Sequence, residues 1–227
     1  MSDEMKTGWW SFELPGYRPH PDAFATYTLF SYEDLPPILE KPDNDFEWLK
    51  SQATKEHSLF KNCYPDGSKP DLSKLARIVS DARINLPESF IIFMNSIELQ
   101  KRVRSCTDCY LDVADYAVRT KGSMAGYLIH FLSDSQWVGH WYIHVDHRGN
   151  HSIVTSLNPY GFHLEEESTS REIDMQEEEF WLCAPSFTEF IYRFWLENEI
   201  WFALAEEERP LNKTEQVYVD KYAREAE

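Results

Sequence analysis

The stretch "GHWYIHVDHRGNHSIV" (residues 139–154) decides the fold that we expect, because its side chains alternate along the chain. Successive side chains of a β-strand point to opposite faces, so a period of two is typical of a strand with one face on the core. The residues "HRGN" (147–150) suit a tight turn, and "HSIV" then resumes the pattern. The stretch therefore predicts a β-hairpin. Its core-facing set is Trp141, Ile143 and Val145, and its opposite set is His140, Tyr142 and His144.

Four of the eight histidines in the chain lie in this stretch and raise the question of a metal site. His140 and His144 share a face of the predicted strand, but their Cα atoms are about 13 Å apart at roughly 3.3 Å per residue. That separation is too large for two ligands that each bind one ion at about 2.1 Å. Only His147 or His151, which flank the turn, could meet a strand histidine across the hairpin, and this alternative stays open. We otherwise expect these histidines on the polar face of the hairpin, as a pH-sensitive rim of a binding face.

The same period of two extends from Cys106 to about Ser156. Residues 127–132 alternate in the same way, so Phe131 and Leu132 are expected on opposite faces. The segment "KGSMAG" (121–126) has the composition of a turn, and "EEFWLCA" (178–184) that of one more strand. Strands joined by short turns form an antiparallel meander, which commonly has one face on the core and one in solvent.

Two helices are expected before the strands. Apolar residues recur at three- and four-residue spacing between 72 and 79, which indicates one buried helix face. The "NLP" sequence at 85–87 ends that helix, and Pro87 suits the first turn of the next one. The expected buried stripes are Leu72, Leu75, Ala76 and Val79 in the first helix, and Phe90, Phe93 and Met94 in the second.

The clearest helix in the chain lies within "SFTEFIYRFWLENEIWFALAEEE" (186–208). Its large apolar residues follow the spacing i, i+3, i+4, i+7 and onward, and we expect it to pack on the sheet. Ser186 and Glu189 form a capping box at its start. The acidic residues 206–208 are unfavourable at the C-terminal end of a helix dipole, unless the helix ends earlier or these acids are kept for another reason. The segment "NKTEQVYVDKYAREAE" (212–227) suggests a polar terminal helix.

Residues 1–45 are rich in aromatic, acidic and proline residues. The prolines exclude long helices there, and the aromatic residues argue against disorder. We therefore expect residues 1–70 to form an ordered extension that packs on a domain of residues 71–227. Covering a sheet edge is one role open to this extension.

The net charge of −17 limits the partners of the chain. Such a field repels phosphate backbones, so we expect no nucleic-acid binding. From Tyr160 onward there are 18 acidic and 6 basic side chains, which places most of the excess in the last third. This surface either aids solubility or meets a basic partner. The sequence has no apolar run of about 18 residues and no apolar signal-peptide core near its start, so we expect a cytoplasmic protein that does not enter a membrane.

Sequence motifs for catalysis or cofactor binding are absent: there is no G-x-S-x-G, P-loop or G-x-G-x-x-G. We expect no enzyme activity, no cofactor and no metal ligands. The four cysteines are expected to be reduced thiols. Cys106 and Cys109 form a single C-x-x-C, whereas structural zinc sites need a second pair or matching histidines. The acid between the two thiols also disfavours a thiolate, although metal or redox use of the pair stays open.

Partner-binding residues are expected in two loops. The loop "DSQWVG" (134–139) places a tryptophan beside an acidic residue, although a tryptophan in the core is the simpler alternative. Three consecutive glutamates at 165–167 repel one another, and a basic partner would relieve that repulsion. The selected partner-binding residues are Asp134, Trp137, Glu165, Glu166 and Glu167.

Four motifs, in this order along the chain, resemble the SUKH superfamily of fungal killer-toxin-resistance proteins and bacterial immunity proteins. "INLPESFIIFMNS" (84–96) is similar to the family's opening pattern L-P-x-x-[FY]-x-x-F-[LM], although the glycine expected after the asparagine is absent. The others are the strand and acid at 131–134, the hairpin at 146–154 and S-F-x-x-F-[IL] at 186–191. The resemblance covers about residues 72–203.

The resemblance implies an α+β fold, with a twisted antiparallel sheet and helices packed against it. It also implies a non-catalytic protein-binding module, and first of all an immunity protein that neutralises a cognate toxin. A nuclease toxin with a basic surface would suit the acidic charge of this chain. A general regulatory or scaffold protein is the alternative, and a metal-dependent enzyme that uses histidines 140–151 is a third hypothesis.

Overall fold

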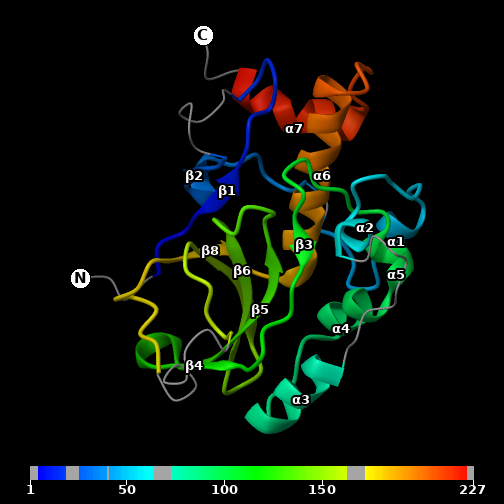
Figure 1. Cartoon of the computed structure of the whole chain (residues 1–227). Coiled ribbons are helices and arrows are strands. Elements are labelled where there is room, and N and C mark those ends of the chain that lie inside the picture. The colour runs from blue at the N-terminus through cyan, green and yellow to red at the C-terminus, as the bar shows by residue number, and fades with distance from the viewer. Residues whose placement is uncertain (1–4, 19–25, 40, 64–72, 163–171, 224–227) are drawn as a thin grey trace.

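The computed structural model describes residues 5–18, 26–39, 41–63, 73–162 and 172–223. Its main strands are β3 (Tyr110–Leu111), β4 (Val118–Thr120), β5 (Gly126–Ser133), β6 (His140–Asp146), β7 (His151–Ser156) and β8 (Phe180–Ala184). They form one antiparallel sheet in the order β3-β5-β6-β7-β8, with β4 also paired to β5 (Figure 1). Strands β5 to β8 are neighbours both in the chain and in the sheet, so the predicted meander and the α+β fold are confirmed.

The helices are α1 (Glu47–Lys50), α2 (Leu59–Cys63), α3 (Ser73–Ala82), α4 (Glu88–Asn95), α5 (Ile97–Gln100), α6 (Phe187–Ala205) and α7 (Lys213–Ala223), with 3₁₀ turns η1 (Tyr32–Asp34) and η2 (Gly122–Met124). Figure 1 shows α6 behind the sheet, with α7 across the end of α6 that lies away from the sheet. Ser186 Oγ accepts a hydrogen bond from Glu189 N at 3.3 Å, as the capping box predicts. In α3 the buried side chains are Leu75 and Ile78, whereas Ala76, expected in the stripe, is exposed.

The sheet face toward α4 and α6 is a hydrocarbon core. Phe187 of α6 packs edge-on against Phe90 and Phe93 of α4 and Phe131 of β5, at centroid distances of 4.9, 5.6 and 5.5 Å. The three core-facing residues predicted for β6 are buried in this same cluster, and so is the stripe predicted for α4. We call this face the helix side of the sheet.

The register of β5 against β6 shifts between His130 and Leu132. Phe131 is an extra residue there, which makes a β-bulge. Because of the bulge, Phe131 and Leu132 both pack in the helix-side core, although the alternation predicts opposite faces for them. Ser133 consequently returns to the face of His130, and their side chains are 3.1 Å apart.

The opposite face of the sheet is buried as well, which corrects the expected polar face of the hairpin. His140 and His144 lie on this face and are almost inaccessible to solvent. The alternation identified which residues of β6 share a face, but not that residues 172–180 cover it. The second cluster on this face, called the histidine side below, contains Val118, Leu128, Tyr142, Val154, Ile173, Met175 and Phe180.

The turn of the β6–β7 hairpin forms where the sequence predicts it. Asp146 Oδ1 accepts hydrogen bonds from the backbone N–H groups of Arg148 and Asn150, both at 2.8 Å. Gly149 has φ +84°, a left-handed conformation that suits a residue without Cβ.

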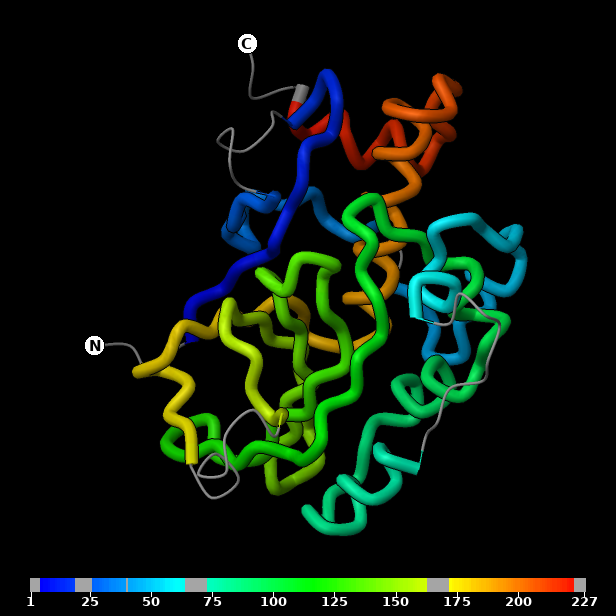
Figure 2. Tube along the Cα trace, in the orientation of Figure 1, coloured from blue at the N-terminus to red at the C-terminus, as the bar shows by residue number. Residues whose placement is uncertain are grey.

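The N-terminal residues share the helix-side core. The N–H of Gly8 donates to the carbonyl of Leu182 at 2.9 Å, and the N–H of Leu182 donates to that of Lys6 at 2.8 Å. Residues 6–8 therefore cover the outer edge of β8, and Figure 2 shows the chain continuing from there toward α7. A separate antiparallel pair is formed by β1 (Trp9–Ser11) and β2 (Thr28–Phe30).

The second half of α6 buries a charged group that joins both ends of the chain. Glu197 is fully buried and accepts hydrogen bonds from Arg18 at 2.9 and 3.0 Å. Trp9 Nε1 and the hydroxyl of Tyr218 also donate to it, at 3.0 and 2.6 Å. Burial alone would raise the pKa of Glu197, and Arg18, Tyr218 and Trp9 together hold that pKa below its usual value. The N-terminal segment and α7 are thus tied to α6 by one buried carboxylate.

The acidic residues after α6 are offset by pairing. The helix ends at Ala205, before the three glutamates. Glu207 accepts hydrogen bonds from Arg104 at 2.6 Å and from Arg209 at 2.9 Å. These arginines neutralise the charge that the helix dipole disfavours.

Candidate functional site

The connection between β5 and β6, residues 134–139, forms a tight turn. Asp134 Oδ1 accepts hydrogen bonds from the backbone N–H groups of Val138 and Gly139, at 2.8 and 3.1 Å. Trp137 has φ +61°. This left-handed conformation is strained for a bulky residue, so the surrounding contacts must hold it in place. We call residues 134–139 the Trp137 turn.

The side chain of Trp137 lies at the surface and is 38 % exposed. Its Nε1–H donates to the hydroxyl of Tyr110 at 2.6 Å. Its ring packs edge-on against His140 at a centroid distance of 5.4 Å, and it is tilted against the ring of Phe162 at 5.5 Å. The adjacent Val138 is 43 % exposed. The turn therefore presents an apolar surface whose aromatic ring is fixed from one side.

The other residues selected from the sequence lie differently. Asp134 is buried, and its Oδ2 has no hydrogen-bond partner among the described residues. Burial raises the pKa of Asp134, and the N–H groups of Gly139 and Val138 act against that rise. Asp134 thus supports the turn from a buried position, and its selection as a partner-binding residue stays a prediction. Glu165, Glu166 and Glu167 lie outside the described residues, so only Asp134 and Trp137 of the selected set are seen together.

Beneath the Trp137 turn lies a buried group of polar side chains that the sequence analysis did not predict. Ser133 Oγ lies 3.1 Å from His130 Nε2 and 3.2 Å from His140 Nδ1, and these two nitrogens are 3.3 Å apart. His130 Nδ1 donates to the backbone carbonyl of Asp112 at 2.5 Å, and His140 Nε2 to that of Trp137 at 3.1 Å. We call His130, Ser133 and His140 the His–Ser–His cluster. Only the bulge in β5 brings these three together, and no sequence pattern marks that bulge.

Both imidazoles of this cluster are neutral near pH 7. Burial lowers the pKa of His130 to about 3; the adjacent His140 acts in the same direction, and the carbonyl of Asp112 opposes it. Burial lowers the pKa of His140 to about 4, against the carbonyl of Trp137. Burial raises the pKa of the Asp112 carboxyl, while Lys74 and the hydroxyl of Ser133 act to lower it.

A serine hydroxyl beside an imidazole has the atoms of a nucleophile and its base. Ser133 is fully buried, however, so a substrate carbonyl cannot reach its oxygen in this conformation. The described part of the chain contains no group of three or more His, Cys, Asp or Glu side chains placed to hold a metal ion. The geometry is therefore that of a buried polar cluster beneath a surface turn.

The cross-strand histidine pair in the structure joins β5 to β6, and not the two strands of the β6–β7 hairpin. His144 Nε2 donates to the carbonyl of Met124 at 3.0 Å. His151 Nε2 faces the N–H of Phe187 at 3.5 Å, and the ring of His147 packs against Tyr127. The histidine that completes a pair with His140 is His130, which lies outside the stretch that raised the metal question.

The cysteines are all free thiols. Burial raises the pKa of Cys106 well above its usual value, and Cys109 adds to this effect. Burial also raises the pKa of Cys109 to about 11, against hydrogen bonds from Thr107 and Ser105. A thiolate is the reactive and metal-binding form, so these environments favour neither redox chemistry nor metal binding at the C-x-x-C pair.

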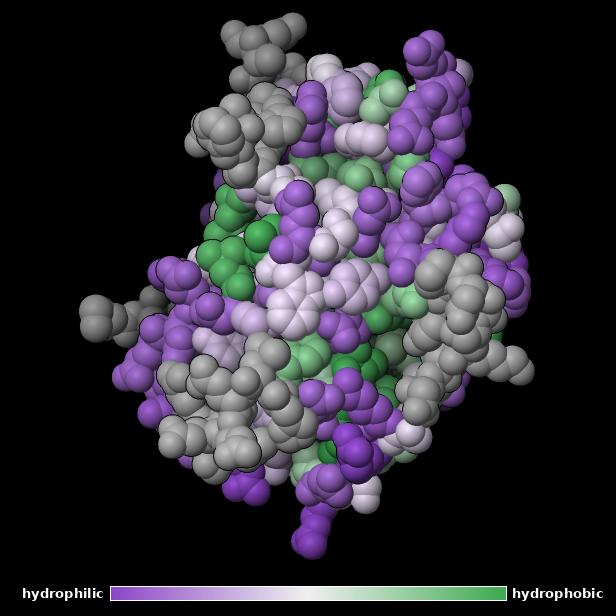
Figure 3. Space-filling view, viewed as in Figure 1, coloured by the Kyte–Doolittle hydropathy of each residue, from purple (hydrophilic) through white to green (hydrophobic). Residues whose placement is uncertain are grey.

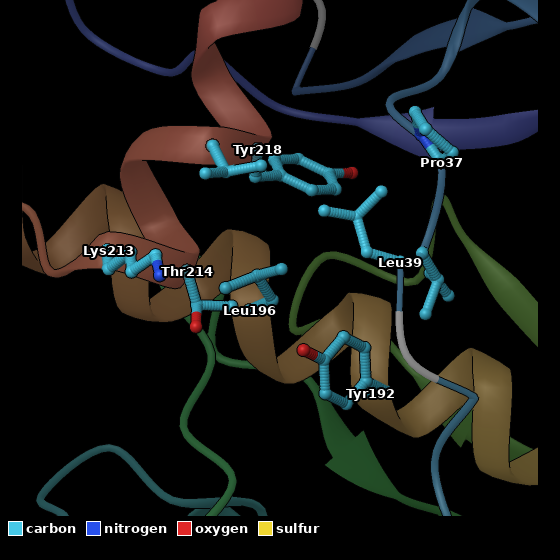
Figure 4. Close-up of a pocket in the computed structure, with 9 residues that line it drawn as sticks. Pro37, Leu39, Tyr192, Leu196, Lys213, Thr214 and Tyr218 are labelled. Atoms are coloured by element: carbon cyan, nitrogen blue, oxygen red, sulfur yellow. The ribbon is translucent and has the colours of Figure 1, made fainter.

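A pocket of ≈ 320 Å³ opens between α6, α7 and residues 37–39 (Figure 4). In Figure 4, Thr214 and Tyr218 lie on the α7 side, with Leu39 across the opening. Leu39 is 71 % exposed. The volume lies at the lower end of the range for small-molecule sites. The full lining is Pro37, Ile38, Leu39, Tyr192, Leu196, Lys213, Thr214, Val217 and Tyr218.

Hydrophilic side chains cover much of the face seen in Figure 3, as the net charge of −17 leads one to expect. None of the described helices combines the length and the hydrophobicity that a membrane span requires. Comparison with known proteins gave no matching family, no matching curated protein and no matching solved structure. The assignment of the Trp137 turn as a candidate site therefore rests only on the geometry of the described residues.

Proposed function

We propose that the chain is a non-catalytic protein-binding module of SUKH type, which acts as an immunity protein and neutralises a cognate toxin in the cytoplasm. The observation that supports this proposal is the Trp137 turn. Strained backbone persists where surrounding contacts hold it, and it is concentrated at functional sites. Here Asp134 and Tyr110 hold an exposed tryptophan, a residue type enriched among binding hot spots.

The charge of the chain indicates what kind of partner would fit. A net charge of −17 attracts a basic protein and accelerates its association. Trp137 would supply the desolvated anchor, and the negative field of the whole chain would steer the partner. A nuclease toxin presents a basic surface to its nucleic acid, and the negative charge of this chain would attract that surface.

The test is coexpression of the chain with the product of each neighbouring gene, followed by copurification and a growth assay. One neighbouring product should be toxic alone, bind the chain and lose its toxicity. Trp137→Ala should weaken that complex by roughly 30-fold, which corresponds to a hot-spot contribution of about 2 kcal/mol. Leu39→Ala is the matched control, because Leu39 is an exposed apolar residue of the pocket and should not affect binding.

Two outcomes would reject the proposal or its site. If no neighbouring product binds the chain, the immunity function fails. If Leu39→Ala weakens the complex and Trp137→Ala does not, the partner uses the pocket instead. Charge reversal at Glu165, Glu166 and Glu167 should mainly slow association and reduce its salt dependence.

The alternative is a regulatory or scaffold module of the same type. The pocket between α6 and α7 is the observation that favours it, because it offers an apolar contact surface separate from the Trp137 turn. Gene neighbourhood distinguishes the two functions, since an immunity gene should lie beside a toxin gene and a scaffold gene need not.

A further inference from the structure

The pocket between α6 and α7, called the α6–α7 pocket below, has walls that hydrogen bonds tie together. Arg193 of α6 donates to the hydroxyl of Tyr218 of α7 at 2.8 Å and to the backbone carbonyl of Pro36 at 2.9 Å. Lys221 of α7 donates to the backbone carbonyl of Leu35 at 2.9 Å. The third wall follows Pro36 directly in the chain, so it is held against both helices. The pocket is therefore formed before any ligand enters, which lowers the conformational cost of binding.

Two exposed hydrocarbon side chains line this pocket from different elements. Leu39 is 71 % exposed and Val217 of α7 is 43 % exposed. A single exposed apolar side chain is ordinary, but these two line one volume of ≈ 320 Å³. An apolar group bound in that volume would remove both side chains from water, which is favourable.

The polar groups of the lining lie at one end of the α6–α7 pocket. Lys213 is the charged residue of the lining, and Thr214 beside it carries a hydroxyl. Neither the ammonium of Lys213 nor the hydroxyl of Thr214 has a hydrogen bond or ion pair to a described residue. In Figure 4 these two residues lie at one end of the pocket, and Pro37 and Leu39 lie at the other. The pocket therefore combines a cation and a hydroxyl donor at one end with hydrocarbon at the other.

The size and the charge of the pocket limit the ligand that fits it. A volume of ≈ 320 Å³ holds about ten non-hydrogen atoms at roughly 30 Å³ for each water-sized group. That size excludes a nucleotide. One lysine matches one negative charge, and the net charge of −17 opposes a ligand with several. A monocarboxylate with an apolar body therefore fits the pocket better than a phosphate ester does.

We propose that the α6–α7 pocket binds a small monocarboxylic acid whose body is aliphatic or aromatic. The carboxylate accepts hydrogen bonds from Lys213 and Thr214, and the apolar body packs against Leu39 and Val217. The bound acid bridges α7 and the segment that follows Pro36. The pocket shares no lining residue with the Trp137 turn, so this site does not depend on the proposed immunity function.

The decisive experiment titrates octanoate, a monocarboxylate of this size, into the full-length wild-type chain and follows methyl resonances by NMR. The methyl signals of Leu39, Leu196 and Val217 should shift together and saturate, with a dissociation constant of about 1 mM or lower. Octanoate should also raise the melting temperature. Octanol, which lacks the charge, should bind about fivefold more weakly, because an exposed ion pair contributes about that factor. If octanoate does not shift these signals, or if octanol binds as tightly, the proposal is wrong.

Variants test the role of each end of the pocket. Lys213→Met should weaken octanoate binding about fivefold and leave octanol binding unchanged, because it removes only the charge. Val217→Glu places an acid beside the apolar body and should weaken the binding of octanoate more than that of octanol. Lys121→Met is the matched control, because Lys121 is an exposed lysine outside the pocket and its loss changes the net charge equally. An unchanged affinity in Lys213→Met, or an equal loss in Lys121→Met, would overturn the proposal.

Discussion

The helix side of the central sheet packs against α4 and α6 through hydrocarbon, whereas its histidine side buries imidazole, phenol and hydroxyl groups under a smaller cluster. Both faces exclude water. On the helix side, shape and buried area suffice to stabilise the packing. On the histidine side, every polar group also needs a partner, because a buried donor or acceptor without one is unfavourable.

Because of this difference, substitutions on the two sides of the sheet should lower the stability of the chain by different amounts and for different reasons. The Phe187 ring has four aromatic neighbours on the helix side at centroid distances between 4.9 and 6.3 Å, so one substitution there removes contacts with several elements. Tyr142 on the other side depends on two hydrogen bonds to residues 158 and 160. We therefore expect large, pH-independent losses from the helix side, and smaller, chemically specific losses from the histidine side.

The largest loss is expected from Phe131→Ala. Phe131 is fully buried and contacts Phe90, Phe187 and Phe190, so its removal leaves a cavity between the sheet and two helices. The free energy of unfolding, measured in urea, should fall by about 3–5 kcal/mol. Leu39→Ala at an exposed position is the control and should change it by less than about 0.5 kcal/mol. A fall of less than about 1 kcal/mol for Phe131→Ala would mean that the helix side is not packed as described.

Much of the helix side could be predicted from the sequence. The period of two placed Trp141, Ile143 and Val145 on one face, and the helical period placed Phe90, Phe93 and Met94 on another. These patterns predict burial because a hydrocarbon face is stabilised by removal from water, whichever segment of the chain covers it. Alternation cannot show whether the second face of a strand is also covered, since that depends on a segment distant in the chain.

The candidate site was only partly predictable for a related reason. A short loop with a tryptophan beside an acid predicted the Trp137 turn, but the role of Asp134 inside it depends on hydrogen bonds that composition does not reveal. The pairing of His130 with His140 depends on one extra residue in β5. A bulge shifts every later side chain to the other face, and the sequence here carries no glycine or other signal for it. Buried charges such as Glu197 were missed because their partners, Arg18 and Tyr218, come from the two ends of the chain.

A smaller loss is expected from Tyr142→Phe on the histidine side. The hydroxyl of Tyr142 donates to the carbonyl of Asn158 and accepts from the N–H of Tyr160. The substitution keeps the ring and leaves both backbone groups without their partner, so the free energy of unfolding should fall by about 1–3 kcal/mol. Tyr127→Phe is the control, because the hydroxyl of Tyr127 has no hydrogen bond to a described residue. This substitution should therefore change the free energy of unfolding very little. If both variants lose the same amount, hydrogen bonding does not distinguish this face.

The smallest effect tests the histidine side through pH, because an imidazole buried there titrates differently in the folded and the unfolded chain, whereas the hydrocarbon ring of Phe131 does not titrate. Burial lowers the pKa of His144, against the carbonyl of Met124. The folded chain therefore keeps His144 neutral, while the unfolded chain protonates it below about pH 6.5. Since the unfolded state then binds more protons, the stability contributed by His144 is complete above that pH. It should fall by up to about 1.4 kcal/mol per pH unit as the pH drops toward the folded pKa. His144→Gln, which can still donate to Met124, should reduce this slope in unfolding curves measured between about pH 7 and pH 5, whereas Phe131→Ala should lower stability at every pH and leave the slope unchanged. An unchanged slope in His144→Gln would mean that this imidazole titrates as freely in the folded chain as in the unfolded one, and that the histidine side is not sealed from water.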